Sequence, residues 1–143
     1  MTEIVFTAEE ISYITFFEGA TGVRVIDCIV KDEDNLIIFV IEGPAIRAIG
    51  RDGSKIRTIK EYLNKDIKVV SYSDDPRVFM RNFFAPYKPR KVEIVEEKGK
   101  RRIYVHVDPT IKPKAIGKNG KNVRLAKELL QRHFKDIDSV IVV

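Results

Sequence analysis

Two short stretches combine glycine with polar and basic residues in a way that suits phosphate binding. Gly50-Arg51-Asp52-Gly53 and Gly117-Lys118-Asn119-Gly120 each place two glycines around two polar residues, and an apolar-periodic segment follows each of them. Glycine permits a tight turn in which the backbone comes close to a ligand. The first amides of a following helix lack an intrahelical acceptor and carry partial positive charge. These stretches therefore predict sites for the phosphates of a sugar-phosphate chain.

The two stretches belong to an internal duplication. Gly117 lies 67 residues after Gly50, and the same offset carries Arg57 onto Arg124. A single Gly-x-x-Gly fits a plain helical hairpin with glycine at its turn equally well, but two copies at one offset indicate a repeated unit. Later in the repeat the offset grows to 70. The helix after the second stretch should therefore be about one turn longer than its counterpart.

The duplication predicts two domains, residues 1–72 and 73–143. Each is near the lower size limit for a self-sufficient core, so we expect each to be stabilised by packing on the other. The first half has 9 basic and 12 acidic side chains, a net charge of −3, and the second has 17 and 9, a net charge of +8. This asymmetry indicates that the second domain supplies much of the attraction to a polyanion, although an unevenly charged, solvated surface would look the same.

The spacing of apolar residues predicts the order helix, two strands, two helices and one strand in both halves. In the first half a capping box of Thr7 and Glu10 starts the first helix, and Gly19 and Gly22 end it. The other elements predicted there are strands 23–30, 36–41 and 67–71, a short helix from Pro44 and a helix over 54–64. Those of the second half are a helix from Asp75-Pro76, strands 92–96, 102–107 and 139–143, a short helix from Pro113 and a helix over 121–134. The fold class is α+β, with helices covering a three-stranded mixed sheet in each domain.

The strand over residues 36–41 is apolar at every position. Alternate residues can face the helices, which leaves three apolar side chains, Leu36, Ile38 and Val40, on the other face of the sheet. An apolar outer face predicts contact with the other domain or with another copy of the chain. The aromatic residues Phe79, Phe83 and Phe84 are interpreted as core or interface rather than as a platform for stacking.

The loop and the element order together resemble a known family. The Gly-x-x-Gly loop between paired helices is similar to that of type II KH domains, which clamp single-stranded nucleic acid. The segment Asp75-Pro76-x-x-Phe79-x-x-Asn82-x-x-Ala85-Pro86 resembles the start of the second KH unit in the NusA family. The chain looks like a short, archaeal NusA-like form with two tandem KH domains. The resemblance implies binding of single-stranded nascent RNA during transcription elongation, termination or antitermination, with RNA polymerase as a further partner.

The candidate RNA-binding residues are the two loops and the basic side chains beside them: Gly50, Arg51, Asp52, Gly53, Lys55, Lys114, Gly117, Lys118, Asn119, Gly120, Lys121 and Arg124. A solvated charge run is the alternative for the lysines. Asp52 would repel phosphate if it faced the strand, which weakens the case for the first loop. Arg57 and Arg124 could contact phosphate or stack on a base, but ion pairs with Glu61 and Glu128 at i+4 are favoured.

Other classes of function receive little support from the sequence. It has no Gly-x-x-x-x-Gly-Lys-Ser/Thr phosphate loop and no His-Glu-x-x-His motif, so we expect no enzyme and no small-molecule substrate. A single cysteine, Cys28, and two histidines cannot build a metal cluster, and we expect no metal or cofactor. No apolar run is long enough for a membrane span, and we expect a cytoplasmic location. A factor for ribosomal RNA processing or ribonucleoprotein assembly is the alternative to a transcription factor.

Overall fold

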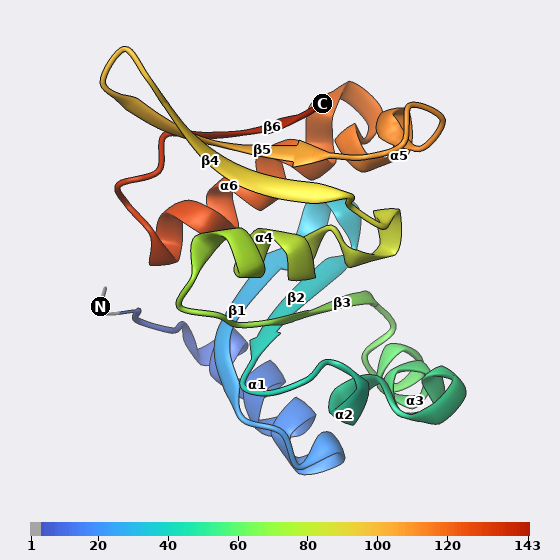
Figure 1. The fold of residues 1–143 in the computed structure, drawn as a ribbon. Coiled ribbons are helices and arrows are strands. Elements are labelled where there is room, and N and C mark those ends of the chain that lie inside the picture. Colours follow the sequence, from blue (N-terminus) through green and yellow to red (C-terminus); the bar gives the residue numbers. More distant parts are fainter. Residues whose placement is uncertain (1–3) are drawn as a thin grey trace. The chain divides into compact units, whose positions relative to one another are not determined.

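The structure, a computed structural model, describes residues 4–143. The chain divides into two compact units, Ile4–Tyr72 and Ser73–Val143 (Figure 1). The first domain predicted from the sequence begins at residue 1, and residues 1–3 lie outside the described residues. Each unit is described by itself below.

The first unit has the predicted order of elements. These are α1 (Ala8–Thr21), β1 (Val25–Lys31), β2 (Leu36–Ile41), α2 (Ile46–Ile49), α3 (Ser54–Leu63) and β3 (Asp66–Ser71). The strands form one sheet in the order β1-β2-β3, in which β1 and β2 are antiparallel and β2 and β3 are parallel. The sheet is therefore mixed, and the predicted α+β class is confirmed.

The ends of α1 show which sequence signals set the start and the end of this helix. Thr7 and Glu10 form the predicted capping box, in which each side chain accepts a hydrogen bond from the other residue's backbone N–H. The expectation that Gly19 ends the helix is wrong, because α1 continues to Thr21. A glycine inside a helix costs only about 1 kcal/mol relative to alanine, which the surrounding turns can offset. The helix ends at Gly22, which adopts the left-handed conformation with φ of +71°.

The core of the first unit lies between the sheet and its helices. Phe17 of α1 stacks on Phe39 of β2 with ring centroids 4.1 Å apart, and Ile59 of α3 is 1% exposed. Ile37 and Ile41 belong to the same buried cluster, so β2 turns the predicted alternate residues toward the helices. Residues 36, 38 and 40 point to the opposite face because side chains alternate along a strand. The expectation of a partner for that face stays a prediction.

The second unit repeats this architecture (Figure 1). Its elements are α4 (Pro76–Phe83), β4 (Lys91–Glu97), β5 (Lys100–His106), α5 (Lys112–Ile116), α6 (Lys121–His133) and β6 (Ser139–Val142). The strand order is β4-β5-β6, with β4 antiparallel and β6 parallel to β5. Helix α6 has 13 residues where α3 has 10, which confirms the extra turn expected from the change of offset.

Helix α4 begins at the predicted cap. The Asp75 carboxylate accepts a hydrogen bond of 2.9 Å from the Arg77 backbone N–H, and proline occupies the first turn. Phe79 and Phe83 are fully buried, as is Phe84 just after the helix, so these rings belong to the interior as expected. The helix ends at Phe83, and a short 3-10 helix over Ala85–Tyr87, which contains Pro86, follows it.

The cap of α4 can be tested by substitution at Asp75. Asp75→Ala should lower the free energy of unfolding by about 1 kcal/mol, because the Arg77 N–H loses its acceptor, and Asp75→Asn should lose less. Hydrogen bonds from the Arg77 side chain and backbone hold the pKa of Asp75 below its usual range. The stabilisation is therefore present above the ordinary carboxyl pKa and fades as pH falls through the lowered one.

Urea unfolding of the three proteins from neutral to strongly acidic pH measures both effects. A difference between wild type and Asp75→Ala that persists undiminished at the acidic end would contradict this account of the cap.

Candidate nucleic-acid interface

The two Gly-x-x-Gly loops have the same backbone conformation. The first glycines, Gly50 and Gly117, both have φ of +81°, with ψ of 167° and 164°. The third loop residues, Asp52 and Asn119, both have φ of +57°, in the left-handed region. Each loop closes with a hydrogen bond from the N–H of its last glycine to the carbonyl of its first, of 3.1 and 3.0 Å. The duplication seen in the sequence is therefore also a duplication of loop geometry.

The first glycine of each loop has no room for a side chain. A Cβ at Gly50 would lie 3.0 Å from the backbone nitrogen of Lys55, and one at Gly117 would lie 2.8 Å from that of Asn122. Their positive φ is in addition a conformation that residues with a Cβ rarely adopt. Glycine is thus required at both positions, because the loop backbone packs directly against the first turn of the next helix.

The helices after the loops begin without a side-chain cap. Gly53 precedes α3 and Gly120 precedes α6, and no side chain accepts a hydrogen bond at either start. The first amides of an α-helix have no partner within the helix and carry partial positive charge. The N–H groups of the first helical residues, Ser54 and Lys121, donate to the carbonyls of Arg51 and Lys118. The helix start beside each loop has no side-chain cap, so its following amides can accept an anion such as phosphate.

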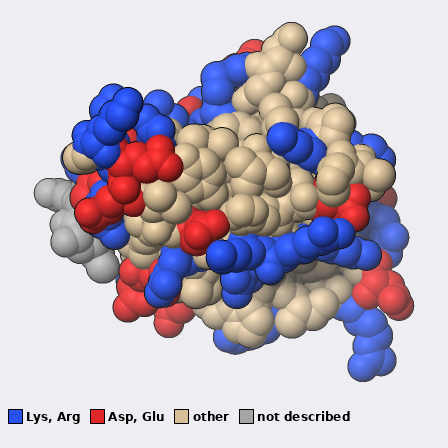
Figure 2. All heavy atoms as spheres, turned by 45° about the horizontal axis from the view of Figure 1, so that its top comes forward, with Lys and Arg blue, Asp and Glu red and all other residues tan. Residues whose placement is uncertain are grey.

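Basic side chains border the second loop on both sides. Lys114 lies in α5, Lys118 in the loop and Lys121 at the first position of α6, and all three residues are exposed. In the view of Figure 2, Lys and Arg side chains project at several places, and patches of Asp and Glu lie among them. The basic side chains beside the second loop favour the approach of a polyanion there.

The first loop carries its charges differently. Arg51 is exposed in the loop, and Lys55 donates a hydrogen bond of 3.3 Å from Nζ to the carbonyl of Arg47. In the second unit Asn122, at the matching position, donates from Nδ2 to the carbonyl of Ala115 at 2.8 Å. Both side chains tie the long helix to the short helix before the loop. Lys55 therefore has a structural role in addition to its charge.

Sequence reasoning omitted one basic residue beside the first loop. Arg47 lies in α2 and is exposed. The offset of 67 residues places it at the position of Lys114, which was among the candidates. The repeat therefore contained the information that Arg47 matches Lys114, and applying the offset to every basic residue would have identified Arg47.

The two matching arginines contact the loops that precede their helices. Arg57 donates from Nη2 to the backbone carbonyl of Asp52 at 3.1 Å, and Arg124 donates from Nη1 to the carbonyl of Asn119. Each guanidinium folds back over its own loop because the left-handed turn brings the third loop carbonyl within its reach. This contact depends on loop geometry, and i+4 spacing alone could not predict it.

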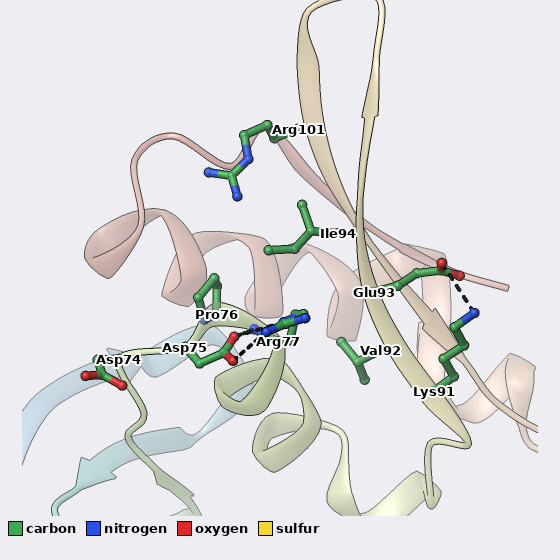
Figure 3. Close-up of a pocket in the computed structure, with 9 residues that line it drawn as sticks. All are labelled: Asp74, Asp75, Pro76, Arg77, Lys91, Val92, Glu93, Ile94 and Arg101. Carbon is green, nitrogen blue, oxygen red and sulfur yellow. Dashed lines mark hydrogen bonds and ion pairs between the residues drawn. The ribbon is translucent and has the colours of Figure 1, made fainter.

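A separate pocket of about 780 Å³ lies in the second unit, away from the loop residues (Figure 3). It is lined by the start of α4, by β4 and by one residue of β5: Asp74, Asp75, Pro76, Arg77, Lys91, Val92, Glu93, Ile94 and Arg101. Each of its basic side chains is held by a carboxylate, namely Arg77 by Asp75, Lys91 by Glu93 and Arg101 by Asp136. The pocket therefore offers no uncompensated cation to an anionic ligand.

Other side chains that could do chemistry have structural surroundings. His106 Nε2 lies 2.5 Å from Glu93 Oε2 across the β4–β5 pair, and this hydrogen bond lowers the pKa of Glu93. Cys28 is fully buried in β1. Within residues 4–143, no group of three or more His, Cys, Asp or Glu side chains could hold a metal ion. No helix there is long and apolar enough to span a bilayer.

Comparison with known proteins assigns the family. Residues 10–82 match the model of the KH domain, and residues 76–140 match that of the NusA-like second KH domain. A protein of Methanocaldococcus jannaschii named probable transcription termination protein NusA is 36% identical, over 94% of this chain and 73% of its own length. The chain belongs to the NusA-like family. The family resemblance seen in the sequence is thereby confirmed.

A further curated relative and a solved structure match nearly the whole chain. The Thermoplasma acidophilum protein of the same name is 32% identical, over 99% of this chain and 97% of its own length. A solved structure titled "Crystal structure of APE1850" superposes with a TM-score of 0.76 at 37% sequence identity, and the match covers 96% of this chain and 100% of that one. The fold with two KH domains is therefore shared with a protein whose structure was determined by crystallography.

The requirement for the first loop glycine can be measured by alanine substitution. Gly117→Ala should destabilise the protein by about 1–3 kcal/mol from its backbone conformation alone, and further through the contact with Asn122. Gly99→Ala is the matched control, since Gly99 has φ of +77° and a Cβ there meets nothing within 4 Å. Urea unfolding of both variants gives the comparison. Equal losses would show that close approach to the helix does not constrain the loop.

Proposed function

We propose that this protein binds single-stranded RNA through both Gly-x-x-Gly loops and acts on the nascent transcript. At the coarser level it is an RNA-binding transcription factor, as its KH domains and the names of its relatives support. The observation that carries the finer proposal is that both loops have one conformation and each precedes an uncapped helix end. We place the two KH domains at residues 1–72 and 73–143, in line with the compact units that meet at Tyr72 and Ser73.

In this proposal each loop holds the sugar-phosphate backbone of the RNA, and the bases contact another part of the domain. Phosphates lie against the loops and the first turns of α3 and α6, where backbone N–H groups beyond the first can donate to them. The contacts come from the candidate residues in and beside the loops other than Arg124, whose role is treated below, and the lysines around the second loop contribute most of the charge. Bases would lie in an apolar groove beside each loop.

The setting is proposed from the names of the relatives. Several archaeal relatives are named probable transcription termination proteins, so we place this chain at a transcribing RNA polymerase, in elongation, termination or antitermination. We assign it no catalysed reaction. The alternative, a factor for ribosomal RNA processing or ribonucleoprotein assembly, uses the same RNA contacts. The two settings differ in the partner that copurifies, which is RNA polymerase in the first and a pre-ribosomal particle in the second.

Single-strand binding can be tested with a labelled RNA pool and fluorescence anisotropy. Replacing both Lys118 and Asn119 with Asp should strongly weaken binding without unfolding the protein, because both side chains are exposed. If roughly three to five phosphates are neutralised, the logarithm of affinity should fall with the logarithm of salt concentration with a slope of about −2 to −3.5.

Duplex RNA and single-stranded DNA serve as competitors, and thermal unfolding checks the fold of the variant. Wild-type affinity in the double variant, or a salt slope near zero, would remove the loop clamp from this proposal.

The acidic residue of the first loop, Asp52, allows a test in which RNA affinity should rise rather than fall. Asp52→Asn should raise affinity for single-stranded RNA by about three- to sixfold at low salt, because it removes a negative charge about 4–6 Å from a bound phosphate. Asn119→Asp should lower affinity by a similar factor. Both changes suit the backbone, since Asp and Asn already occupy these two positions at the same φ of +57°. An unchanged affinity in both variants would show that neither loop contacts phosphate.

A further inference from the structure

One arginine in each unit makes the same unusual contact. The Arg57 and Arg124 guanidinium groups donate to the carbonyls of Asp52 and Asn119, which are the third residues of the two loops. Both arginines lie one turn into the helix after the loop, and both residues are exposed. The two loops differ at both residues between their glycines, yet the contact is the same. It is therefore a property of the shared loop geometry.

The acceptor residue in each loop is held in a conformation that its own chemistry does not favour. Asp52 and Asn119 have φ of +57°, and residues with a side chain adopt the left-handed region only at a cost, although Asp and Asn tolerate it best. A charged donor to the carbonyl of such a residue stabilises the turn more than a neutral donor would.

The second glycine of the loop leaves space for this contact in the second unit. A Cβ at Gly120 would lie 3.2 Å from Arg124 Nη1, which is tighter than ordinary packing. Gly120 therefore provides both its positive φ of +74° and room for the guanidinium. In the first unit the nearest atom to a Cβ at Gly53 is Ile56 Cγ2 at 3.8 Å, so the space there is less restricted.

We propose that Arg57 and Arg124 are positioning residues for the two loops. Each fixes the third carbonyl of its loop and so keeps the loop in the form that leaves the next helix end uncapped and open to phosphate. Guanidinium suits this role because its planar fork of N–H donors reaches a carbonyl in a fixed direction, whereas a lysine ammonium is a flexible point charge. The expected effect of these arginines on RNA affinity rests on the proposed binding of single-stranded RNA by the loops.

The decisive variant is Arg124→Lys, which keeps the charge and removes the fork. If Arg124 positions the loop, this variant should lose at least fivefold in affinity for single-stranded RNA while its salt slope stays at the wild-type value. If Arg124 instead contacts phosphate directly, lysine should retain most of the affinity, and Arg124→Gln should make the slope shallower by about 0.7. Lys127→Gln, on the exposed surface of α6, is the matched control for loss of charge alone.

A second readout does not depend on RNA. The Gly120 N–H donates to the Gly117 carbonyl at 3.0 Å and closes the loop, so its hydrogen exchange reports loop opening. Exchange at Gly120, followed by NMR, should be at least tenfold faster in Arg124→Lys than in wild type, with no change in thermal unfolding. Arg57→Lys should have the same effect on Gly53. Wild-type exchange rates in both variants would overturn the positioning role.

The two proposals fail in different ways. If the Lys118 and Asn119 double variant keeps wild-type affinity, loop-mediated binding is wrong, while the exchange measurement still decides the positioning role. If the double variant loses affinity but Arg124→Lys matches wild type in both affinity and exchange, binding stands and the positioning role is wrong.

Discussion

The close approach of loop backbone to helix at Gly50 and Gly117 is the constraint on which the rest of each unit depends. No Cβ fits at either position, since the next helix begins only about 3 Å from where it would be. Three residues later, Gly53 and Gly120 stand directly before α3 and α6, and glycine cannot cap a helix with a side chain. The same turn sends the third loop carbonyl toward the arginine one helical turn later. The close approach at the first glycine, the helix start without a side-chain cap and the arginine contact thus all occur within one short turn.

The two loops have the same backbone conformation, but the two halves of the chain differ in net charge. Their loops agree within a few degrees in the dihedral angles compared, whereas Asp52 stands where the second unit has Asn119. The first half of the chain has a net charge of −3 and the second a net charge of +8, from 9 basic and 12 acidic against 17 basic and 9 acidic side chains. A difference in RNA affinity between the loops would therefore come from side-chain electrostatics rather than from backbone shape.

Sequence reasoning succeeded where a signal is local or periodic. The boundaries of β2, the capping box at Thr7 and the cap at Asp75 were predicted, because alternation and capping act within a few residues. It failed at Gly19, where glycine inside α1 was mistaken for a stop, because packing along the helix outweighs a weak local preference. It omitted Arg47 because that residue lies before the loop, although the repeat offset locates it.

The sequence by itself determined the repeat, the order of elements in each unit, the mixed three-stranded sheets and the family. All of these can be predicted from residue spacing and short motifs. Only the tertiary structure decided what the side chains around the loops contact. The spacing of Arg57 and Arg124 suggested only acids one turn later as partners, and the structure shows that both guanidinium groups reach back to loop carbonyls. Lys55 and Asn122, two different residues, make matching tethers to the preceding helix. The reason is that a left-handed turn brings the loop against the helix. Contacts between loop and helix depend on distances in space, which the spacing of residues along the sequence does not give.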